Sequence, residues 1–451
     1  MSWGLRPGDR EQLAELGVEG YLERQLTYDT LPDPEIDTFM AKNQALQADV
    51  VKLRELSDAD YSRLMEQIVW ARLYRAATSE RQLFEKMVEL WTDHFNVPIP
   101  DLLPDKIIDD REVVRQHALG KFSDLLRASA MSPAMLEFLN NSSSNKDYPN
   151  ENYGRELLEL HTLGVDGGYS ERDVKEVARA FTGWTLHEGY PGRFYFRPEW
   201  HDDSEKVVLG RTLPAGRGIE DGLEVLDLLA HHPSTARFIA LKLGRTFVQD
   251  DPPESFIAST AKVFLDSDGD LKTTVRHVFG TDAFWASSGK KFRRPLEQVV
   301  AMMRALQPAL SVTPAGREHF IWALETMGHK PFHWFPPNGY PNVAPAWIST
   351  SGLLNRWNFA MVLPYASEDW FDGVTLALDD YLPQAETVGA WLEDSSQMLR
   401  GITLGDAERD ALTTFVADTT DPDYPVTAEL RADKRAAVTG LLLASARFQW
   451  S

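Results

Sequence analysis

Amphipathic helical segments recur along almost the whole of this 451-residue chain. Residues 9–27 and 434–448, near the two ends, place apolar side chains three or four positions apart, the spacing of one helix face. A longer pattern of this kind runs from Ser57, a good N-cap residue, to Phe95, and prolines follow it. The periodicity therefore predicts a mainly α, multi-helical globular protein.

Two long segments interrupt the helical pattern. Gly189–Leu213 and Gly328–Trp347 are rich in glycine, proline and aromatic residues, and we expect both to be ordered loops. The first contains at most a small β-hairpin. The chain then forms one multi-helical domain over residues 1–451, or it divides into 1–188 and 214–451 around the aromatic loop.

Composition excludes several classes of protein. The formal charge is −22, which argues against non-specific binding to nucleic acids or anionic membranes. Without cysteine the chain has no disulfide, no thiolate nucleophile and no cysteine-ligated metal cluster. The first residues do not resemble a signal peptide, and no apolar run approaches the roughly 18 residues that span a bilayer. We therefore expect a soluble, acidic protein.

The stretch from Asn150 to Trp184 holds the most suggestive polar residues. At about 100° per residue, Glu156 and Glu159 share one arc of the helix predicted over Gly154–Gly164, with Arg155 at its edge. Leucines cover most of the remaining surface, so the helix should be buried and its acids need partners. Two readings follow: the acids are catalytic, or they form a structural ion network with arginine.

Two histidines are further candidates for acid–base chemistry. His94 lies at the edge of an apolar stripe near a helix end, so it is either a core-edge histidine or a base or metal ligand that faces the Glu156 helix. His201 is followed by Asp202 and, four residues later, by Lys206 in the aromatic loop. This combination is typical of a catalytic or anion-binding loop, and equally of a hydrogen-bonded turn.

Two groups of side chains are candidates for substrate binding. Flat or sugar-like substrates stack on aromatic rings, although most aromatic side chains belong to the core. A basic cluster is unusual in so acidic a chain, and it either holds an anionic group or complements an acidic helix. The aromatic candidates are Trp184, Tyr195, Trp200, Trp334 and Tyr340, and the basic cluster is Lys290, Lys291, Arg293 and Arg294.

Familiar catalytic signatures are absent from the sequence. There is no nucleophile elbow, no zinc-binding His-Glu-x-x-His, no glycine-rich phosphate loop and no dinucleotide fingerprint. No spacing of residues demands a metal, and no cofactor is indicated.

The central block NENYGRELLELHTLG, with GGYSERDVKEVARAFTGW after it, resembles the bacterial family called domain of unknown function 1800. Further matching blocks include KMVELWTDHFNV, WHDDSEK, STARFIALKLGRTFV, KFRRPLEQVV and PPNGYPNVAPAWISTSGLLNRWNF, so the resemblance covers the chain from about Trp3 to Trp450. Gly154 departs from the alanine expected there. The resemblance supplies no catalytic residues.

The resemblance does imply a bacterial source and a partner. Proteins of this kind are commonly encoded beside an exported, sulfatase-like family called domain of unknown function 1501. This chain alone is then expected in the cytoplasm, or in the periplasm or outside the cell if it is exported together with that partner.

These observations predict an enzyme of hydrolase or lyase type. Glu156 or Glu159 would be the acid and His94 or His201 the base, in a site covered by the His201 loop and by residues 336–347. Arg155, Lys206 and the aromatic residues would bind the substrate. The alternatives are a non-catalytic scaffold or export partner, and a metal-dependent enzyme that uses the same histidines and acids.

Overall fold

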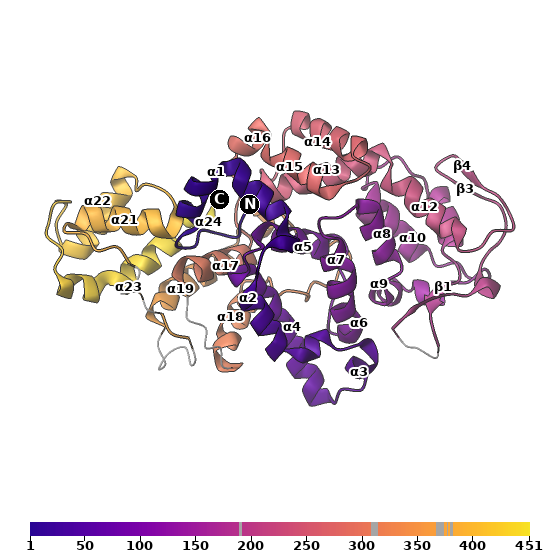
Figure 1. Cartoon of the computed structure of the whole chain (residues 1–451), viewed down its shortest axis with the longest axis horizontal. Helices are drawn as coiled ribbons and strands as arrows, with labels where there is room; N and C mark the ends of the chain where they lie inside the picture. The colour runs from indigo at the N-terminus through magenta and orange to yellow at the C-terminus, as the bar shows by residue number, and fades with distance from the viewer. Residues whose placement is uncertain (189–191, 308–313, 367–373, 377, 379–381) are drawn as a thin grey trace.

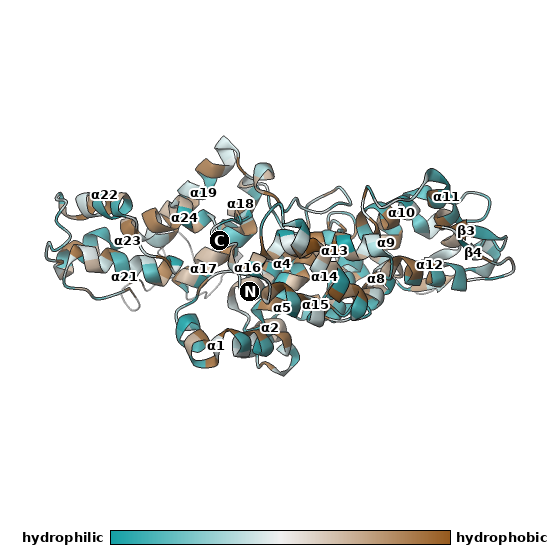
Figure 2. Ribbon diagram, turned by 90° about the horizontal axis from the view of Figure 1, so that it is seen from above, coloured by the Kyte–Doolittle hydropathy of each residue, from teal (hydrophilic) through white to brown (hydrophobic). Residues whose placement is uncertain are grey.

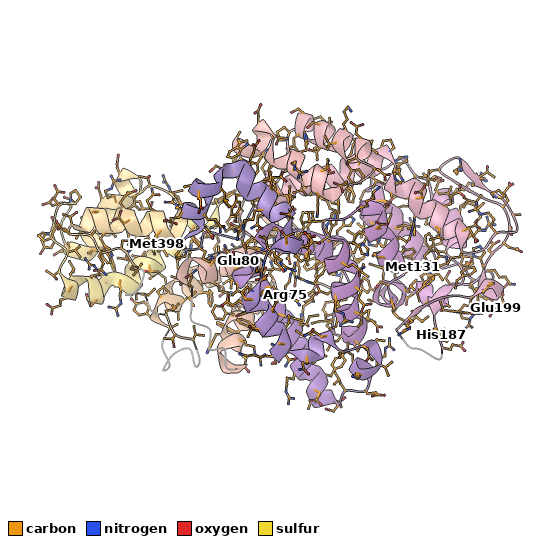
Figure 3. The ribbon with its side chains drawn as sticks, viewed as in Figure 1. Arg75, Glu80, Met131, His187, Glu199 and Met398 are labelled. Atoms are coloured by element: carbon orange, nitrogen blue, oxygen red, sulfur yellow. The ribbon has the colours of Figure 1, made fainter. Side chains whose placement is uncertain are left out.

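Helices dominate the protein, as the periodicity predicts, and they form an elongated body (Figure 1). Two small β-hairpins lie at one end of the long axis, and the helices of the C-terminal bundle lie at the other. Figure 3 marks the same axis, with Glu199 toward one end, Met398 toward the other and Glu80 between them. The computed structural model describes residues 1–188, 192–307, 314–366, 374–376, 378 and 382–451.

The larger of two main hydrophobic cores is built mostly from the first two-thirds of the chain. It takes residues from both sides of the predicted aromatic loop, of which residues 189–191 lie outside the described part. Its helices are α1 (Asp9–Leu26), α5 (Gln82–His94), α8 (Phe122–Ala130), α9 (Pro133–Phe138), α10 (Glu151–Glu156), α11 (Glu171–Ala180), α12 (Glu220–Ala230), α13 (Pro233–Phe247), α14 (Glu254–Asp266), α15 (Leu271–Phe279) and α16 (Asp282–Trp285). The short α7 (Arg115–His117) precedes α8 and adds no buried residue to this core.

The second core joins an early segment of the chain to the C-terminal helices. Most helices carry both hydrophilic and hydrophobic residues in Figure 2, as expected when one face is buried. Helix α17 also carries both kinds of residue, but all of its residues are buried. The helices around this core are α2 (Pro34–Lys42), α3 (Val50–Arg54), α4 (Asp58–Thr78), α6 (Leu103–Ile108), α17 (Pro295–Leu306), α18 (Pro314–Thr326), α19 (Thr350–Val362), α21 (Val388–Arg400), α22 (Asp406–Ala417), α23 (Ala428–Ala444) and α24 (Ala446–Gln449).

The long helix predicted from Ser57 to Phe95 is in fact two helices. Ser57 caps α4 as predicted, by accepting a hydrogen bond from the Asp60 amide. The break falls at Ser79, whose backbone is extended and whose hydroxyl donates to Asp33 over 2.5 Å. Because α4 packs in the second core and α5 in the first, this break passes the chain from one core to the other.

The central helix is also less regular than predicted. After the short α10 the chain continues as a π-helical segment, Leu157–Thr162. Such segments occur often at functional sites. The structure explains why position 154 is glycine and not alanine. A β-carbon there would lie 3.1 Å from the Val174 carbonyl oxygen of α11. The close packing of α10 on α11 therefore favours glycine.

The aromatic segment forms two hairpins where at most one was expected. Strand β1 (Trp184–Leu186) pairs antiparallel with β2 (Phe194–Phe196), and β3 (Lys206–Val208) pairs with β4 (Arg211–Leu213). Ser170 and Asp173 form a capping box at the start of α11. No helix in the described ranges is both long and apolar enough to cross a membrane.

Candidate functional site

Helix α5 lies at the centre of the molecule and carries charged residues along one side. Lys86, Glu89 and Asp93 are spaced three and four positions apart, so they share a face of the helix. The opposite face is apolar, and Met87 and Trp91 are fully buried in the first core. Folding therefore draws the charged face of α5 inward with the rest of the helix.

Arginines from two other segments neutralise the acids on α5. Arg72 of α4 contacts Glu89 at 2.5 Å, and Arg294 contacts Glu89 at 3.1 Å and Asp93 at 2.5 Å. Arg72 and Arg294 are almost fully buried. Buried charges of this kind need such partners, and they hold α4, α5 and the start of α17 in one arrangement.

Glu297 fixes the start of α17 against α5. Its Oε1 accepts a hydrogen bond from Lys86 Nζ at 2.6 Å, and its Oε2 accepts one from the Arg294 amide at 2.9 Å. Burial alone would raise the pKa of Glu297, but Lys86 and Arg294 outweigh it and hold that pKa well below its usual range. Lys86 is therefore committed to an ion pair.

A loop from the second irregular segment closes over the end of α5. Gly339 has a φ of 68°, and a β-carbon there would lie 2.0 Å from the Asp93 carbonyl oxygen. Only glycine permits this approach. The Tyr340 amide then donates to Asp93 Oδ1 over 3.3 Å, and Asn342 donates to the Thr246 hydroxyl over 3.2 Å. The loop is thereby fastened to both α5 and α13.

Helix α13 supplies the fourth wall. Lys242, Arg245 and Thr246 lie three and four positions apart and face the charged side of α5. At Gly244 a β-carbon would lie 2.6 Å from the Pro252 ring, so a glycine is needed for α13 to pack against the start of α14. This packing sets the position of the two cations on α13.

These four segments enclose a cavity of about 160 Å³. Its charged lining contains four cations and three acids: Lys86, Lys242, Arg245, Arg294, Glu89, Asp93 and Glu297. Its other lining residues are Leu90, His94, Thr246, Asn338, Tyr340, Pro341 and Asn342. The cavity is thus a small polar site with more positive than negative groups.

Lys242 is the one lysine of this cavity without an acidic partner in the described part of the chain. Its ammonium lies over the Phe238 ring, 5.0 Å from the ring centroid. Burial lowers the pKa of Lys242 to about 8; Asp93 opposes this shift and Arg245 adds to it. A substantial fraction of this amine is therefore neutral at mildly alkaline pH.

The pKa of Asp93 is shifted in the opposite direction from that of Lys242. Burial raises its pKa to about 6, and Glu89 adds to the shift while Arg294 opposes it. The same carboxyl group raises the pKa of Lys242, so the two groups interact across the cavity. Both change charge near neutral pH, which is the property required of groups that exchange protons with a substrate.

His94 closes the cavity on the side of the first core and is fully buried. Its Nε2 lies 3.0 Å from the His161 carbonyl oxygen, to which it donates, and its Nδ1 has no partner in the described structure. Burial and the Lys242 charge keep the pKa of His94 well below its usual value, so His94 is neutral. Across the described residues, no three His, Asp or Glu side chains converge in a way that could hold a metal ion.

Of the residues predicted from the sequence, His94, Tyr340 and Arg294 of the basic cluster line this cavity, and so do three further residues of the segment expected to cover the site, Asn338, Pro341 and Asn342. Glu156 and Glu159 are partly exposed and do not line it. Burial raises the pKa of Glu156, and Glu159 adds to the shift. Arg155 binds neither acid and instead forms two hydrogen bonds of 2.7 Å with Glu171.

The predicted loop cluster forms a separate, closed network near the hairpins. His201 Nε2 lies 3.3 Å from Asp221 Oδ2, and Lys206 Nζ lies 2.7 Å from the same oxygen. Asp202 is bound by Arg179 at 2.7 Å, and this contact helps to hold its pKa well below the usual range against the effect of burial. These contacts fit the hydrogen-bonded-turn reading of this cluster.

None of the three predicted tryptophans, Trp184, Trp200 and Trp334, lines the cavity. Trp184 is fully buried, and a β-carbon on Gly222 would lie 2.5 Å from its ring. Trp200 stacks under the Arg197 guanidinium, 4.2 Å from its ring centroid. Arg294 of the basic cluster pairs with acids on α5, as expected if this cluster complements an acidic helix.

Comparison with known proteins now places the chain in a family. The structure defines a mainly α protein with a small cationic cavity between its central helices. The chain belongs to the family described as protein of unknown function (DUF1800), whose model matches residues 1–450. No curated protein and no solved structure matches the chain.

Proposed function

We propose that the protein is an enzyme of hydrolase or lyase type that acts on a small anionic substrate in the cavity between α5 and α13. The observation that carries this proposal is the pair of cations on α13. Within the described ranges neither Lys242 nor Arg245 has a carboxylate partner, although the chain as a whole carries a net charge of −22. Two uncompensated cations that face a cavity favour a negatively charged ligand.

The size of the cavity supports a small substrate. Cavities that hold drug-sized ligands span roughly 300–1,000 Å³. At about 160 Å³ this one suits a molecule of a few carbon atoms that bears a carboxylate, phosphate or sulfate group. In this proposal Arg245 and Lys242 bind the anionic group, and Asp93 exchanges protons with the substrate in the role expected earlier of Glu156 or Glu159.

Isothermal titration with oxalate, phosphate and sulfate tests the binding step. We expect one site per chain that is lost in Lys242→Met and Arg245→Met and kept in Lys52→Met, which removes an exposed lysine. Oxalate binding should weaken as the pH rises past about 8, because Lys242 then loses its charge. If none of the three anions binds, or if all variants bind alike, the proposal is wrong.

Turnover is tested by following mixtures of small phosphate, sulfate and carboxylate compounds by NMR in the presence of the protein. We expect one class to be consumed by the wild-type protein and spared by Asp93→Asn. That variant keeps one acceptor oxygen, which can still accept a hydrogen bond from Arg294 but not also from the Tyr340 amide, so a loss of activity with oxalate binding retained would report on proton exchange. Equal turnover by the variant and the wild type would contradict the role of Asp93.

A second candidate function is that of a partner of the sulfatase-like family called domain of unknown function 1501. The supporting observation is an apolar groove of about 280 Å³ between α18 and α19. Trp322 and Trp357, which are 64% and 45% exposed, lie on these two helices, together with the exposed Leu354. Trp322 lines the groove, and exposed apolar surface of this kind marks sites of protein–protein contact.

Co-expression with the sulfatase-like protein tests this second proposal. We expect the two proteins to co-purify, and Trp322→Glu to abolish the complex while Trp285→Glu, a matched change at an exposed tryptophan elsewhere, leaves it intact. Fractionation of cells with and without the partner gene tests export. A protein that stays in the cytoplasm in both cases is not exported with this partner.

A further inference from the structure

The two lysines that line the cavity differ in one respect. Lys86 donates a 2.6 Å hydrogen bond to Glu297, so its nitrogen is occupied. Lys242 contacts the face of Phe238 and, in the described residues, has no hydrogen-bond acceptor for its ammonium. An amine kept against an aromatic ring and beside a neutral histidine has an unused lone pair once its proton leaves. This is the arrangement of an activated lysine nucleophile.

We infer that Lys242 forms an imine with the carbonyl group of a small oxo acid, whose carboxylate is bound by Arg245. This inference rests on the proposed function, and it selects the lyase type and an anionic aldehyde or ketone as the substrate. Arg245 follows Lys242 by three positions on α13, so their β-carbons lie roughly 5–6 Å apart on one helix face. That spacing suits a substrate whose carboxylate and carbonyl carbons are neighbours.

Arg245 has the hydrogen-bonding capacity that this role needs. Its Nε donates to the Asp250 carbonyl oxygen over 3.2 Å, which fixes the plane of the guanidinium. The remaining N–H groups have no partner in the described structure, and an arginine can bind a carboxylate through two parallel hydrogen bonds. The carboxylate of the substrate would then be anchored beside the amine.

Asp93 supplies the proton transfers that imine formation requires. The neutral Lys242 amine adds to the carbonyl carbon, a C–N bond forms, and the carbonyl oxygen gains the proton that leaves the nitrogen. Protonated Asp93 then gives a proton to the hydroxyl group, the C–O bond breaks, and water leaves. An iminium and the Asp93 carboxylate remain, so charge and atoms balance without an oxidant or a metal.

The iminium and Asp93 together explain a lyase reaction. The iminium withdraws electrons from the adjacent carbon and makes its proton acidic, and the Asp93 carboxylate can accept that proton. Burial, which lowers the pKa of Lys242 to about 8 and raises that of Asp93 to about 6, makes both transfers accessible near neutral pH. Loss of that proton leaves a neutral enamine, which expels the leaving group of the substrate with its electron pair from the next carbon and so regenerates an iminium. Water then adds to the iminium carbon and releases Lys242 and the unsaturated oxo acid.

Reductive trapping tests this inference. The full chain is incubated with glyoxylate at low millimolar concentration and pH 7.5, reduced with borohydride and mapped by peptide mass spectrometry. We expect one carboxymethyl group per chain, on Lys242, at least tenfold faster than on the exposed Lys52 and Lys175. Arg245→Met should raise the glyoxylate concentration for half-maximal trapping roughly 10–100-fold, the loss expected for hydrogen bonds to a charged group.

Oxalate separates the two proposals, because it is close to the probe in size and also carries a carboxylate but does not form an imine under these conditions. Oxalate binding that depends on Arg245, without preferential trapping on Lys242, would overturn the imine and leave the proposed function standing. Failure of both oxalate binding and trapping would overturn both. Lys242→Arg keeps the positive charge, so we expect it to bind oxalate and to give no trapped product at the cavity.

Discussion

Potassium cyanate should carbamylate Lys242 far faster than any exposed lysine at pH 7. Cyanate reacts with neutral amines only. A pKa of about 8, in place of 10.5, leaves roughly 9% of Lys242 neutral at pH 7 against about 0.03% of an ordinary lysine, a ratio of roughly 300. An amine of lower pKa is also a weaker nucleophile, so we expect an observed advantage of at least tenfold.

The assay is a time course of labelling at low cyanate concentration, read by peptide mass spectrometry. Lys52 and Lys175 are exposed and serve as internal references in the same sample. Oxalate should protect Lys242 and leave both references unchanged, because Lys242 lines the cavity and neither reference lysine does.

Two variants test the physical cause of this reactivity with opposite expected signs. Asp93 raises the pKa of Lys242, so Asp93→Asn should lower that pKa further and speed labelling at pH 7. Arg245 lowers the pKa of Lys242, so Arg245→Met should raise it and slow labelling. Reactivity of Lys242 equal to that of the references, or the same direction of change in both variants, would refute the reasoning.

Four further results are expected. Lys242→Met should stabilise the protein at pH 7 by about 1–3 kcal/mol in urea denaturation, and the gain should shrink as the pH rises from about 8 toward 10.5, because there the unfolded chain also loses the lysine proton. Arg294→Met should destabilise by roughly 3–5 kcal/mol in the same assay, since it leaves buried acids without a partner. Gly339→Ala forces alanine into a left-handed conformation and against Asp93, so it should cost at least about 1–2 kcal/mol and weaken oxalate binding. Glu156→Gln, at a partly exposed position, should change stability by less than about 0.5 kcal/mol and leave oxalate binding intact.

The features of the fold that depend on local sequence were predictable. The capping residue Ser57 and the capping box at Ser170 act within a few residues of themselves, and both are present. The break between α4 and α5 was not predictable, because it depends on a hydrogen bond from Ser79 to Asp33, which lies 46 residues earlier. The π-helical segment Leu157–Thr162 likewise has no local signature in the spacing of apolar residues.

The candidate site was only partly predictable for the same reason. His94 was predicted from its position at the edge of an apolar stripe near a helix end, and Tyr340 as an aromatic side chain of the second irregular segment, and both line the cavity. Asp93 is one of 68 acidic residues, and nothing in its neighbourhood along the chain predicts a raised pKa. Lys242 stands out because no carboxylate pairs with it in the described residues, and only the folded structure shows this.

The position of Lys242 is itself an argument for a ligand. An ammonium in this place destabilises the folded state near neutral pH, and a methionine would fill the same space without that effect. Two other cations of this cavity, Lys86 and Arg294, are paired with carboxylates, whereas Lys242 has no such partner in the described residues. Helix α13 carries the unpaired Lys242 and, one turn later, Arg245, which has only one hydrogen-bond acceptor in the described structure. A bound anion would pair with both cations and would stabilise the folded state. We therefore expect oxalate to raise the melting temperature of the wild-type protein and to leave that of Lys242→Met nearly unchanged. If oxalate changes neither melting temperature, Lys242 is a packing defect and not part of a binding site.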